Sequence, residues 1–187
     1  MPLIDHFGIL APYYEKFIPP RKPEKIIELA ALPIQGTLLD VGGGTGRISQ
    51  ALKGLAERVV VADLSRNMLR QAVHQHGLKS VQSHSEWLPF PDDYFERVIM
   101  VDALHHVCNQ EQTAAELWRV LRPGGRLIVE EPDVRTLSVK LVALAEKMAL
   151  MRSHFLAPPH IASLFAVRGG QTRIEIEGYN AWVVVEK

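Results

Sequence analysis

Five short apolar runs alternate with longer stretches of mixed polarity along the first two thirds of the chain. The runs are rich in β-branched residues, which favour strands, and they lie near residues 37–41, 58–63, 79–83, 96–101 and 126–131. The stretches between them have helical spacing. In one of them an apolar face is formed by Ala114, Leu117, Trp118 and Leu121. Strands that alternate with helices predict a parallel sheet covered by helices.

The last third of the chain departs from this alternation. Residues 134–151 repeat leucine and methionine at helical spacing, and Pro158-Pro159 separates them from a shorter segment around residues 160–166. Residues 172–177 then alternate between apolar and polar side chains, and 181–185 form a second apolar run after a turn. This pattern predicts an antiparallel β-hairpin.

The first apolar run ends in an acid followed by glycines, Asp40-Val41-Gly42-Gly43-Gly44-Thr45-Gly46. A strand that breaks into such a turn lets a ligand approach the main chain closely. A dinucleotide fold has GxGxxG spacing, and a carboxylate at its strand end would repel the pyrophosphate. The spacing here is GxGxG, and a carboxylate suits a ligand with an amine. S-adenosylmethionine is an amino acid joined to a nucleoside, so it has both the amine that suits the carboxylate and the nucleoside that suits the glycine turn.

A second acid, Asp63, ends the run Arg58-Val59-Val60-Val61-Ala62. At the carboxyl end of a strand it could accept two hydrogen bonds from a ribose diol. A nicotinamide dinucleotide would require the same acid, and a carboxylate here could also cap the next helix. Asp63 therefore indicates a nucleoside-type cofactor but does not distinguish S-adenosylmethionine from a nicotinamide dinucleotide.

Three later segments complete a resemblance. They are Leu88-Pro89-Phe90-Pro91-Asp92, Asp102-Ala103-Leu104-His105-His106, and Leu121-Arg122-Pro123-Gly124-Gly125 before the fifth apolar run. With the glycine loop and Asp63, the chain resembles the class I S-adenosylmethionine-dependent methyltransferases over residues 7–131, and in particular their small-molecule, quinone-biosynthesis-like branch. The resemblance implies an α/β fold: a doubly wound, mostly parallel seven-stranded Rossmann-like sheet that ends in an antiparallel β-hairpin.

The resemblance also implies how the chain is divided. Its length of 187 residues suits a single domain. We expect lid helices in 1–33, a cofactor-binding core in 34–131, a helical acceptor-side segment in 132–169 and the hairpin in 170–187. In the first part, Phe7, Leu10, Ala11 and Tyr14 are similar to a family opening in which the tyrosine closes over the cofactor. Core packing of one helix face would explain the same spacing.

The adenine contact departs from the family pattern. Many relatives have an acid before the LPF segment, where this chain has Ser83-His84-Ser85-Glu86. His84 or Ser85 could accept the adenine amino hydrogen, and Glu86 could substitute for them. Leu64 and Met68 line the adenine or belong to the core. The resemblance implies this cofactor-binding set: Tyr14, Asp40, Gly42, Gly43, Gly44, Gly46, Asp63, Leu64, Met68, His84, Ser85, Glu86, Val101, Asp102 and His106.

Methyl transfer needs a general base only when the acceptor must lose a proton. His105 and His106 follow the fourth apolar run, where the family turns toward the transferred methyl group, and an imidazole suits a phenol or an activated carbon acid. They are our catalytic candidates, although histidines at this place also serve as packing groups.

Charge and composition exclude several classes of partner. Lys plus Arg and Asp plus Glu both number 21, so no global field attracts nucleic acid or an anionic bilayer. The single Cys108 cannot form an internal disulfide or a thiolate metal cluster, and we expect no metal site. No apolar run reaches the length of roughly 20 residues that a membrane span needs, and no signal peptide is evident. We expect a cytoplasmic protein, and the pattern leaves its oligomeric state open.

The function predicted from these observations is methyl transfer from S-adenosyl-L-methionine to a small, apolar or aromatic acceptor by C-, O- or N-methylation. One alternative is a non-catalytic module that binds the cofactor and acts through a partner. The other is a nicotinamide-dependent enzyme, because Asp63 alone does not exclude it.

Overall fold

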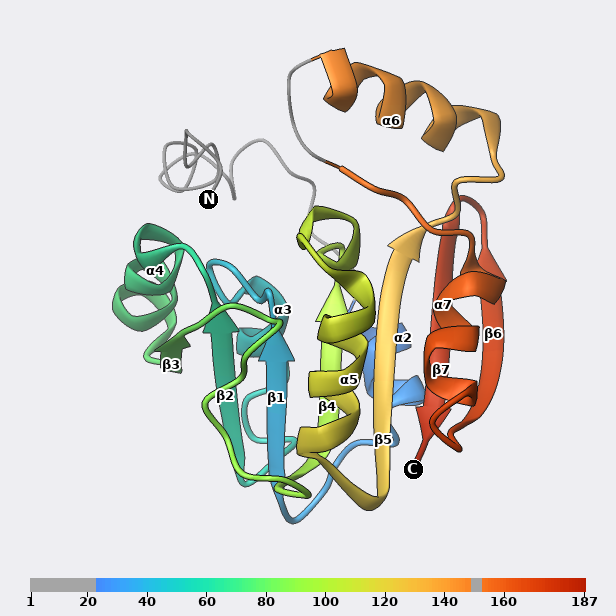
Figure 1. Ribbon diagram of the computed structural model, residues 1–187. Helices are drawn as coiled ribbons and strands as arrows, with labels where there is room; N and C mark the ends of the chain where they lie inside the picture. Colours follow the sequence, from blue (N-terminus) through green and yellow to red (C-terminus); the bar gives the residue numbers. More distant parts are fainter. Residues whose placement is uncertain (1–22, 149–152) are drawn as a thin grey trace.

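The computed structural model describes residues 23–148 and 153–187, and within them seven strands form one sheet (Figure 1). The strand order is β3-β2-β1-β4-β5-β7-β6. Pairing is parallel from β3 to β5, and β7 pairs antiparallel with both β5 and β6. This arrangement confirms the fold class expected from the sequence. The strands are β1 (Thr37–Val41), β2 (Arg58–Asp63), β3 (Lys79–Gln82), β4 (Phe95–Val101), β5 (Leu121–Pro132), β6 (Gln171–Glu177) and β7 (Asn180–Glu186).

Helices cover both faces of the sheet. Helices α2, α3 and α4 share one apolar core with the sheet, and α5 and α7 share another core on the face toward the viewer in Figure 1. A short 3₁₀ helix, η1, follows β4. The bounds are α2 (Glu24–Leu29), α3 (Arg47–Ala51), α4 (Arg66–His76), η1 (Leu104–His106), α5 (Gln110–Val120), α6 (Leu137–Met148) and α7 (Pro158–Ala166).

The two cores follow from the period of two along each strand. Leu38 and Leu39 are adjacent in β1 and both fully buried, yet Leu38 packs with the α2 to α4 side and Leu39 with the α5 to α7 side. Ile99 and Met100 divide in the same way in β4. A strand buried on both faces reads as a continuous apolar run, which is why these runs were visible in the sequence.

The end of α5 differs from the expectation. The helix begins at its N-cap Asn109, whose side chain accepts a hydrogen bond from the Gln112 N–H at 3.0 Å. It ends at Val120, and Leu121 belongs to β5 instead of the helix. Leu121 pairs with Phe95, and the strand pairing then resumes at Arg126 after an irregularity. The Pro-Gly-Gly segment is therefore a bulge within β5.

Helix α6 also differs, in what its apolar stripe contacts. Figure 1 shows α6 standing beyond the carboxyl ends of the central strands, away from both cores. Leu137, Leu141 and Leu144 are 74%, 60% and 56% exposed, whereas Val139 is buried. The helical spacing predicted the helix but not its surroundings, because no described element covers this stripe.

Candidate functional site

Acidic side chains gather at the carboxyl edge of the sheet. Asp40 and Asp63 lie in the last residues of β1 and β2, Asp102 directly follows β4, and Glu130 and Glu131 lie near the end of β5. These strands are parallel neighbours, so their carboxyl ends meet at one edge. Ligands of open α/β sheets bind at this edge, where the strand order reverses between β1 and β4.

The glycine loop is closely packed against the loop that follows β4. Gly42 has a φ of +72°, and a Cβ atom added there would lie 2.6 Å from the Cβ atom of Ala103. A Cβ atom on Gly43 would lie 2.6 Å from the Asp40 carboxyl carbon, and one on Gly46 would lie 2.3 Å from Leu78. Larger side chains at these positions would displace the loop.

One position in the loop has room. A Cβ atom on Gly44 would meet nothing within 4 Å, although the φ of +56° still favours glycine. The Gly44 N–H donates to Asp63 Oδ2 at 2.9 Å. The loop therefore has a braced inner side and an open outer side, as expected for a cradle that a ligand approaches.

Asp40 is a buried carboxylate with one partner. It is 1% exposed, and its Oδ2 accepts a hydrogen bond from Ser49 Oγ at 2.8 Å. Its Oδ1 is buried and has no hydrogen-bond partner among the described residues. Burial, opposed by the Ser49 hydrogen bond and aided by the nearby Asp63 charge, raises the pKa of Asp40 to about 7. A buried, unmatched carboxylate oxygen fits the amine of an amino-acid cofactor, which would supply the missing donor.

Asp63 has partners on both oxygens. Besides the bond from Gly44, its Oδ1 accepts a hydrogen bond from the Ser65 N–H at 2.8 Å, and Ser65 is the N-cap of α4. The carboxylate thus joins the glycine loop to the start of α4. Each carboxylate oxygen can accept two bonds, so a ribose diol could still bind there, and that role stays a prediction.

The three candidates for the adenine contact have different surroundings. The His84 side chain is 42% exposed and lies edge-on to Trp87. Ser85 Oγ contacts Thr113 Oγ1 at 3.1 Å and donates to Glu86 Oε2 at 3.3 Å. Glu86 is buried, and its Oε1 accepts the N–H groups of residues 108 and 109 at 3.0 and 3.1 Å. Glu86 thus holds the start of α5, which leaves His84 as the most accessible of the three.

The apolar candidates for the cofactor site also differ in exposure. Met68 is 3% exposed on α4, whereas Leu64 is 44% exposed and Val101 is partly buried. Leu64 is open to a ligand, and Met68 is enclosed by protein. Tyr14 and the other residues of the predicted lid face, Phe7, Leu10 and Ala11, lie outside the described residues.

The loop after β4 carries the catalytic candidates and is held by an acid that the sequence analysis did not single out. Glu131 Oε1 accepts hydrogen bonds from the N–H groups of Ala103 and Leu104 at 3.0 and 2.7 Å. Glu131 Oε2 lies 2.6 Å from His105 Nδ1. Asp102, at the head of this loop, has a φ of +55°, which aspartate tolerates better than most residues.

His105 and His106 differ in environment. His105 is 3% exposed, and its ring lies 4.2 Å from the Phe155 ring in a stacked arrangement. His106 is partly buried, and its Nδ1 lies 3.3 Å from Ser153 Oγ. Burial and the neighbouring His105, opposed by Asp102, lower the pKa of His106 to about 4, so His106 is neutral at pH 7. The structure brings both candidates to the carboxyl edge and places the Glu131 carboxylate at hydrogen-bond distance from the His105 ring.

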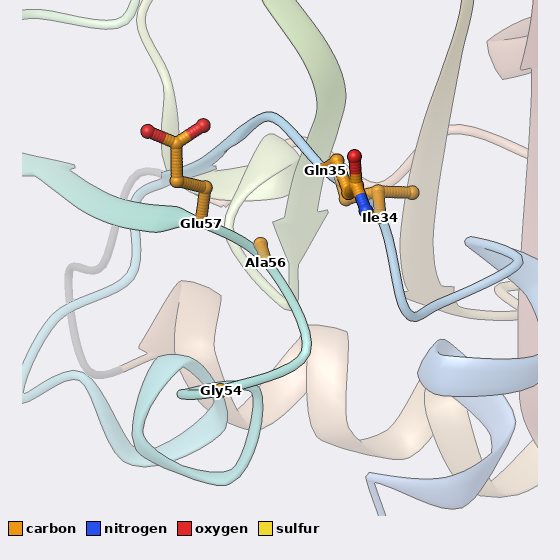
Figure 2. Close-up of a pocket in the computed structure, with 5 residues that line it drawn as sticks. All are labelled: Ile34, Gln35, Gly54, Ala56 and Glu57. Atoms are coloured by element: carbon orange, nitrogen blue, oxygen red, sulfur yellow. The ribbon is translucent and has the colours of Figure 1, made fainter.

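A separate hollow lies at the opposite edge of the sheet. The hollow has a volume of about 420 Å³ and is lined by Ile34, Gln35, Gly54, Ala56 and Glu57, whose side chains are drawn in Figure 2. These residues precede β1 and β2, so the hollow lies beside the amino ends of the strands. None of the sequence-predicted site residues lines it. Over residues 23–148 and 153–187 there is also no group of acids, histidines and cysteines placed to hold a metal ion, and no helix with the length and apolarity of a membrane span.

The comparisons with known proteins agree with this geometry. The model of a methyltransferase domain family matches residues 39–129, from the glycine loop to the middle of β5. The ubiquinone/menaquinone biosynthesis C-methyltransferases of Hahella chejuensis and Proteus mirabilis are 37% and 36% identical to the chain over 115 residues. These alignments cover 56% of the chain and 46% of each relative, so the chain matches less than half the length of these curated relatives.

Solved structures share the fold over nearly the whole chain. A SAM-dependent methyltransferase from Thermotoga maritima superimposes with a TM-score of 0.79 at 21% identity and covers 97% of each chain. The DhpI protein in complex with S-adenosylhomocysteine gives a TM-score of 0.72 at 20% identity, over 97% of this chain and 93% of that one. At these identities the likeness establishes the fold.

Proposed function

This chain belongs to the class I S-adenosylmethionine-dependent methyltransferases, and from that premise we propose that it methylates a ring carbon of a small aromatic acceptor of the quinol type. When bound, S-adenosylmethionine supplies a methyl group activated by its sulfonium. The protein's own residues hold the cofactor, orient the acceptor, exclude water and accept the proton that the ring loses.

The single observation that carries the methyl-donor assignment is the pair of strand-end acids around the glycine loop. Asp40 presents a buried Oδ1 without a donor among the described residues, which suits an amine ligand, and Asp63, to which we assign the ribose, accepts the Gly44 N–H. A pyrophosphate would be repelled by Asp40, so the nicotinamide alternative is disfavoured. The quinol-type acceptor rests on the two curated relatives, which are named as C-methyltransferases of quinone biosynthesis, and on the Phe155 ring beside His105.

The proposal predicts that S-adenosylhomocysteine stabilises the protein. A ligand that binds only the native state at about 100 times its Kd adds about 2.7 kcal/mol to the free energy of unfolding. For a chain of this size that raises Tm by roughly 5–10 °C. Thermal unfolding followed by circular dichroism measures the shift. NADH is the matched control, and a shift with NADH but none with S-adenosylhomocysteine would overturn the proposal.

Replacing Asp63 with alanine tests the ribose contact. Loss of hydrogen bonds to a charged group weakens binding by about 1.5–3 kcal/mol, so the Kd for S-adenosylhomocysteine should rise about 10- to 150-fold. Titration calorimetry at 25 °C measures it. The variant also loses the bonds to Gly44 and Ser65, so unfolding of the ligand-free variant is measured separately.

The control for this variant is Asp92→Ala. Asp92 is an exposed carboxylate that pairs with Arg119, outside the glycine loop, and its loss should leave the Kd unchanged. If Asp63→Ala binds S-adenosylhomocysteine as tightly as the unmodified protein does, Asp63 has no ribose role and serves only to join the loop to α4.

The acceptor is tested by a methyl-release assay with 1,4-naphthohydroquinone kept in its reduced form. The proposal expects a product methylated on a ring carbon, identified by mass spectrometry and proton NMR. A product methylated on oxygen would retain the methyltransferase assignment and reject the C-methylation. Binding of S-adenosylhomocysteine without turnover on phenols, quinols or amines would favour the non-catalytic module instead.

A further inference from the structure

Glu131 is placed to act on the catalytic loop from the neighbouring strand. It lies in β5 and is 3% exposed, so little water reaches its carboxylate. One oxygen holds two backbone N–H groups at the entry to η1, and the other lies 2.6 Å from His105 Nδ1. Buried carboxylates are costly unless they are hydrogen-bonded, and all three bonds are directed at the loop after β4.

The His105 ring also contacts two aromatic rings. Its centroid lies 3.9 Å from that of His106 and 4.2 Å from that of Phe155, with the Phe155 plane within 14° of parallel. The backbone of the same segment is tied down as well, because the His154 N–H donates to the His105 carbonyl at 2.7 Å. The two ring contacts and the contact at Nδ1 leave the imidazole little freedom to rotate.

The titratable groups around His105 come from three parts of the chain. Glu131 approaches from β5, His106 is adjacent in η1, and His154 belongs to the segment that covers the ring. Asp102 precedes the loop and acts electrostatically on His106. The Glu131 carboxylate is at hydrogen-bond distance from the His105 ring.

We propose that Glu131 is a positioning residue that fixes His105 in the tautomer with hydrogen on Nδ1, so that Nε2 of His105 is the proton acceptor in methyl transfer. A carboxylate at Nδ1 orients an imidazole and stabilises the imidazolium that forms when Nε2 takes a proton. This inference rests on the proposed function. It also separates the two histidines, because Ser153 Oγ lies at Nδ1 of His106 and the lowered pKa of His106, about 4, makes it a weak base near pH 7.

On a quinol-type ring, methyl transfer and proton loss take place at the same ring carbon. The acceptor carbon forms a bond to the methyl carbon while the bond from that methyl carbon to sulfur breaks, and its electron pair stays on sulfur. The same ring carbon then loses its hydrogen as a proton to His105 Nε2, which restores the aromatic ring. Glu131 keeps its negative charge throughout and pairs with the imidazolium until the proton passes to solvent.

The first test observes the His105 tautomer directly and needs no substrate. NMR of the ¹⁵N-histidine-labelled protein near pH 7.5 distinguishes a protonated from an unprotonated ring nitrogen, and comparison with His105→Gln assigns the His105 signals. The proposal expects hydrogen on Nδ1 and an unprotonated Nε2. A ring with hydrogen on Nε2 would overturn it, whether or not a substrate has been found.

The second test is Glu131→Gln. The amide oxygen can still accept the two backbone N–H groups, but the amide NH₂ can donate to Nδ1 and then favours the wrong tautomer. With S-adenosylmethionine and 1,4-naphthohydroquinone, we expect kcat to fall at least about 10²-fold with KM and the Kd for S-adenosylhomocysteine nearly unchanged. Glu116→Gln is the matched control. Glu116 is also a carboxylate that accepts a backbone N–H, from Leu88, and it lies away from this loop, so kcat should be unchanged.

A double variant separates positioning from a structural role. If Glu131 acts through His105, then Glu131→Gln has little further effect on kcat in a His105→Gln background. Equal losses of kcat in both backgrounds would show that Glu131 only supports the fold. If the Glu131→Gln variant does not fold, the NMR test of the unmodified protein decides. Normal turnover of Glu131→Gln would reject the inference and leave the proposed function standing. Absence of both turnover and S-adenosylhomocysteine binding in the unmodified protein would reject the proposed function instead.

Discussion

Turnover of the His105→Ala variant is expected to be lower by about 10²–10⁴-fold, the usual contribution of a general base. The Kd for S-adenosylhomocysteine should hardly change, because a base acts in the transition state and not in ground-state binding. His105 is buried against Phe155, so truncation to alanine also leaves a cavity. His105→Gln, which keeps a donor toward Glu131, should lose as much turnover with less loss of stability.

His106→Ala is the control for this prediction. His106 has a pKa near 4 and contacts Ser153, so we expect it to shape the acceptor wall and to influence KM more than kcat. The measurement is single-turnover kinetics together with calorimetric binding for all three variants. If His106→Ala loses turnover while His105→Ala keeps it, the roles that we assign to the two histidines are reversed.

A second large effect is expected at Asp40, and it depends on pH. Burial raises the pKa of this carboxyl to about 7 in the native protein, against an ordinary value of 3.8. Between these two values the unfolded chain has released the proton that the native protein still holds, so ligand-free stability falls as pH rises from about 4 to 7. Above about pH 7 both states are ionised and the loss is complete. At about 1.4 kcal/mol per pKa unit, the total loss is about 4 kcal/mol.

Asp40→Asn removes this titration. The variant pays a constant cost for a buried amide beside Ser49, so the informative quantity is the difference in unfolding free energy between the two proteins as a function of pH. That difference should shift in favour of the variant by about 4 kcal/mol from pH 4 to pH 8. Urea unfolding of the ligand-free proteins measures it. Two curves that stay parallel across this range would show that Asp40 does not titrate as described.

Strands β1, β4, β5 and β7 could be predicted because their apolar runs are buried on both faces of the sheet. Leu38 and Leu39 point into different cores, so the run that contains them has no polar position and stands out in the sequence. Asp40 and Asp63 were predictable for the opposite reason, since an acid directly after such a run must lie at the carboxyl edge. The glycine loop followed from the conformations that only glycine adopts easily, as at Gly42.

Contacts between distant segments could not be predicted in this way. The partner of Asp40 is Ser49, one turn into a helix, and nothing in the spacing indicates that contact. Glu131 was missed although it lies at the end of an apolar run exactly as Asp63 does, so the same strand-end rule would have found it. Its link to His105 depends on the register of β4 against β5, which no local pattern specifies.

Exposure was the least predictable property. Helical spacing in residues 134–151 predicts α6, but the pattern cannot tell a stripe that faces the core from one that faces outward, as Leu137, Leu141 and Leu144 do. The roles of His84, Ser85 and Glu86 likewise depended on which side chains meet the start of α5. Glu86 does so through residues 108 and 109, and no local rule indicates this.

The position of β7 between β5 and β6 affects how the chain folds during its synthesis. In the chain β6 precedes β7, yet β6 touches the sheet only through β7. During synthesis β6 therefore emerges before the strand that will join it to the sheet, and the edge of β5 stays open until residues 180–186 arrive. Pairing of Arg126 with Glu186 closes a loop of about sixty residues, a slow step by the dependence of folding rate on contact order. A nascent chain that stalls before β7 would thus display an unpaired apolar edge, the feature that chaperones recognise and that aggregation exploits.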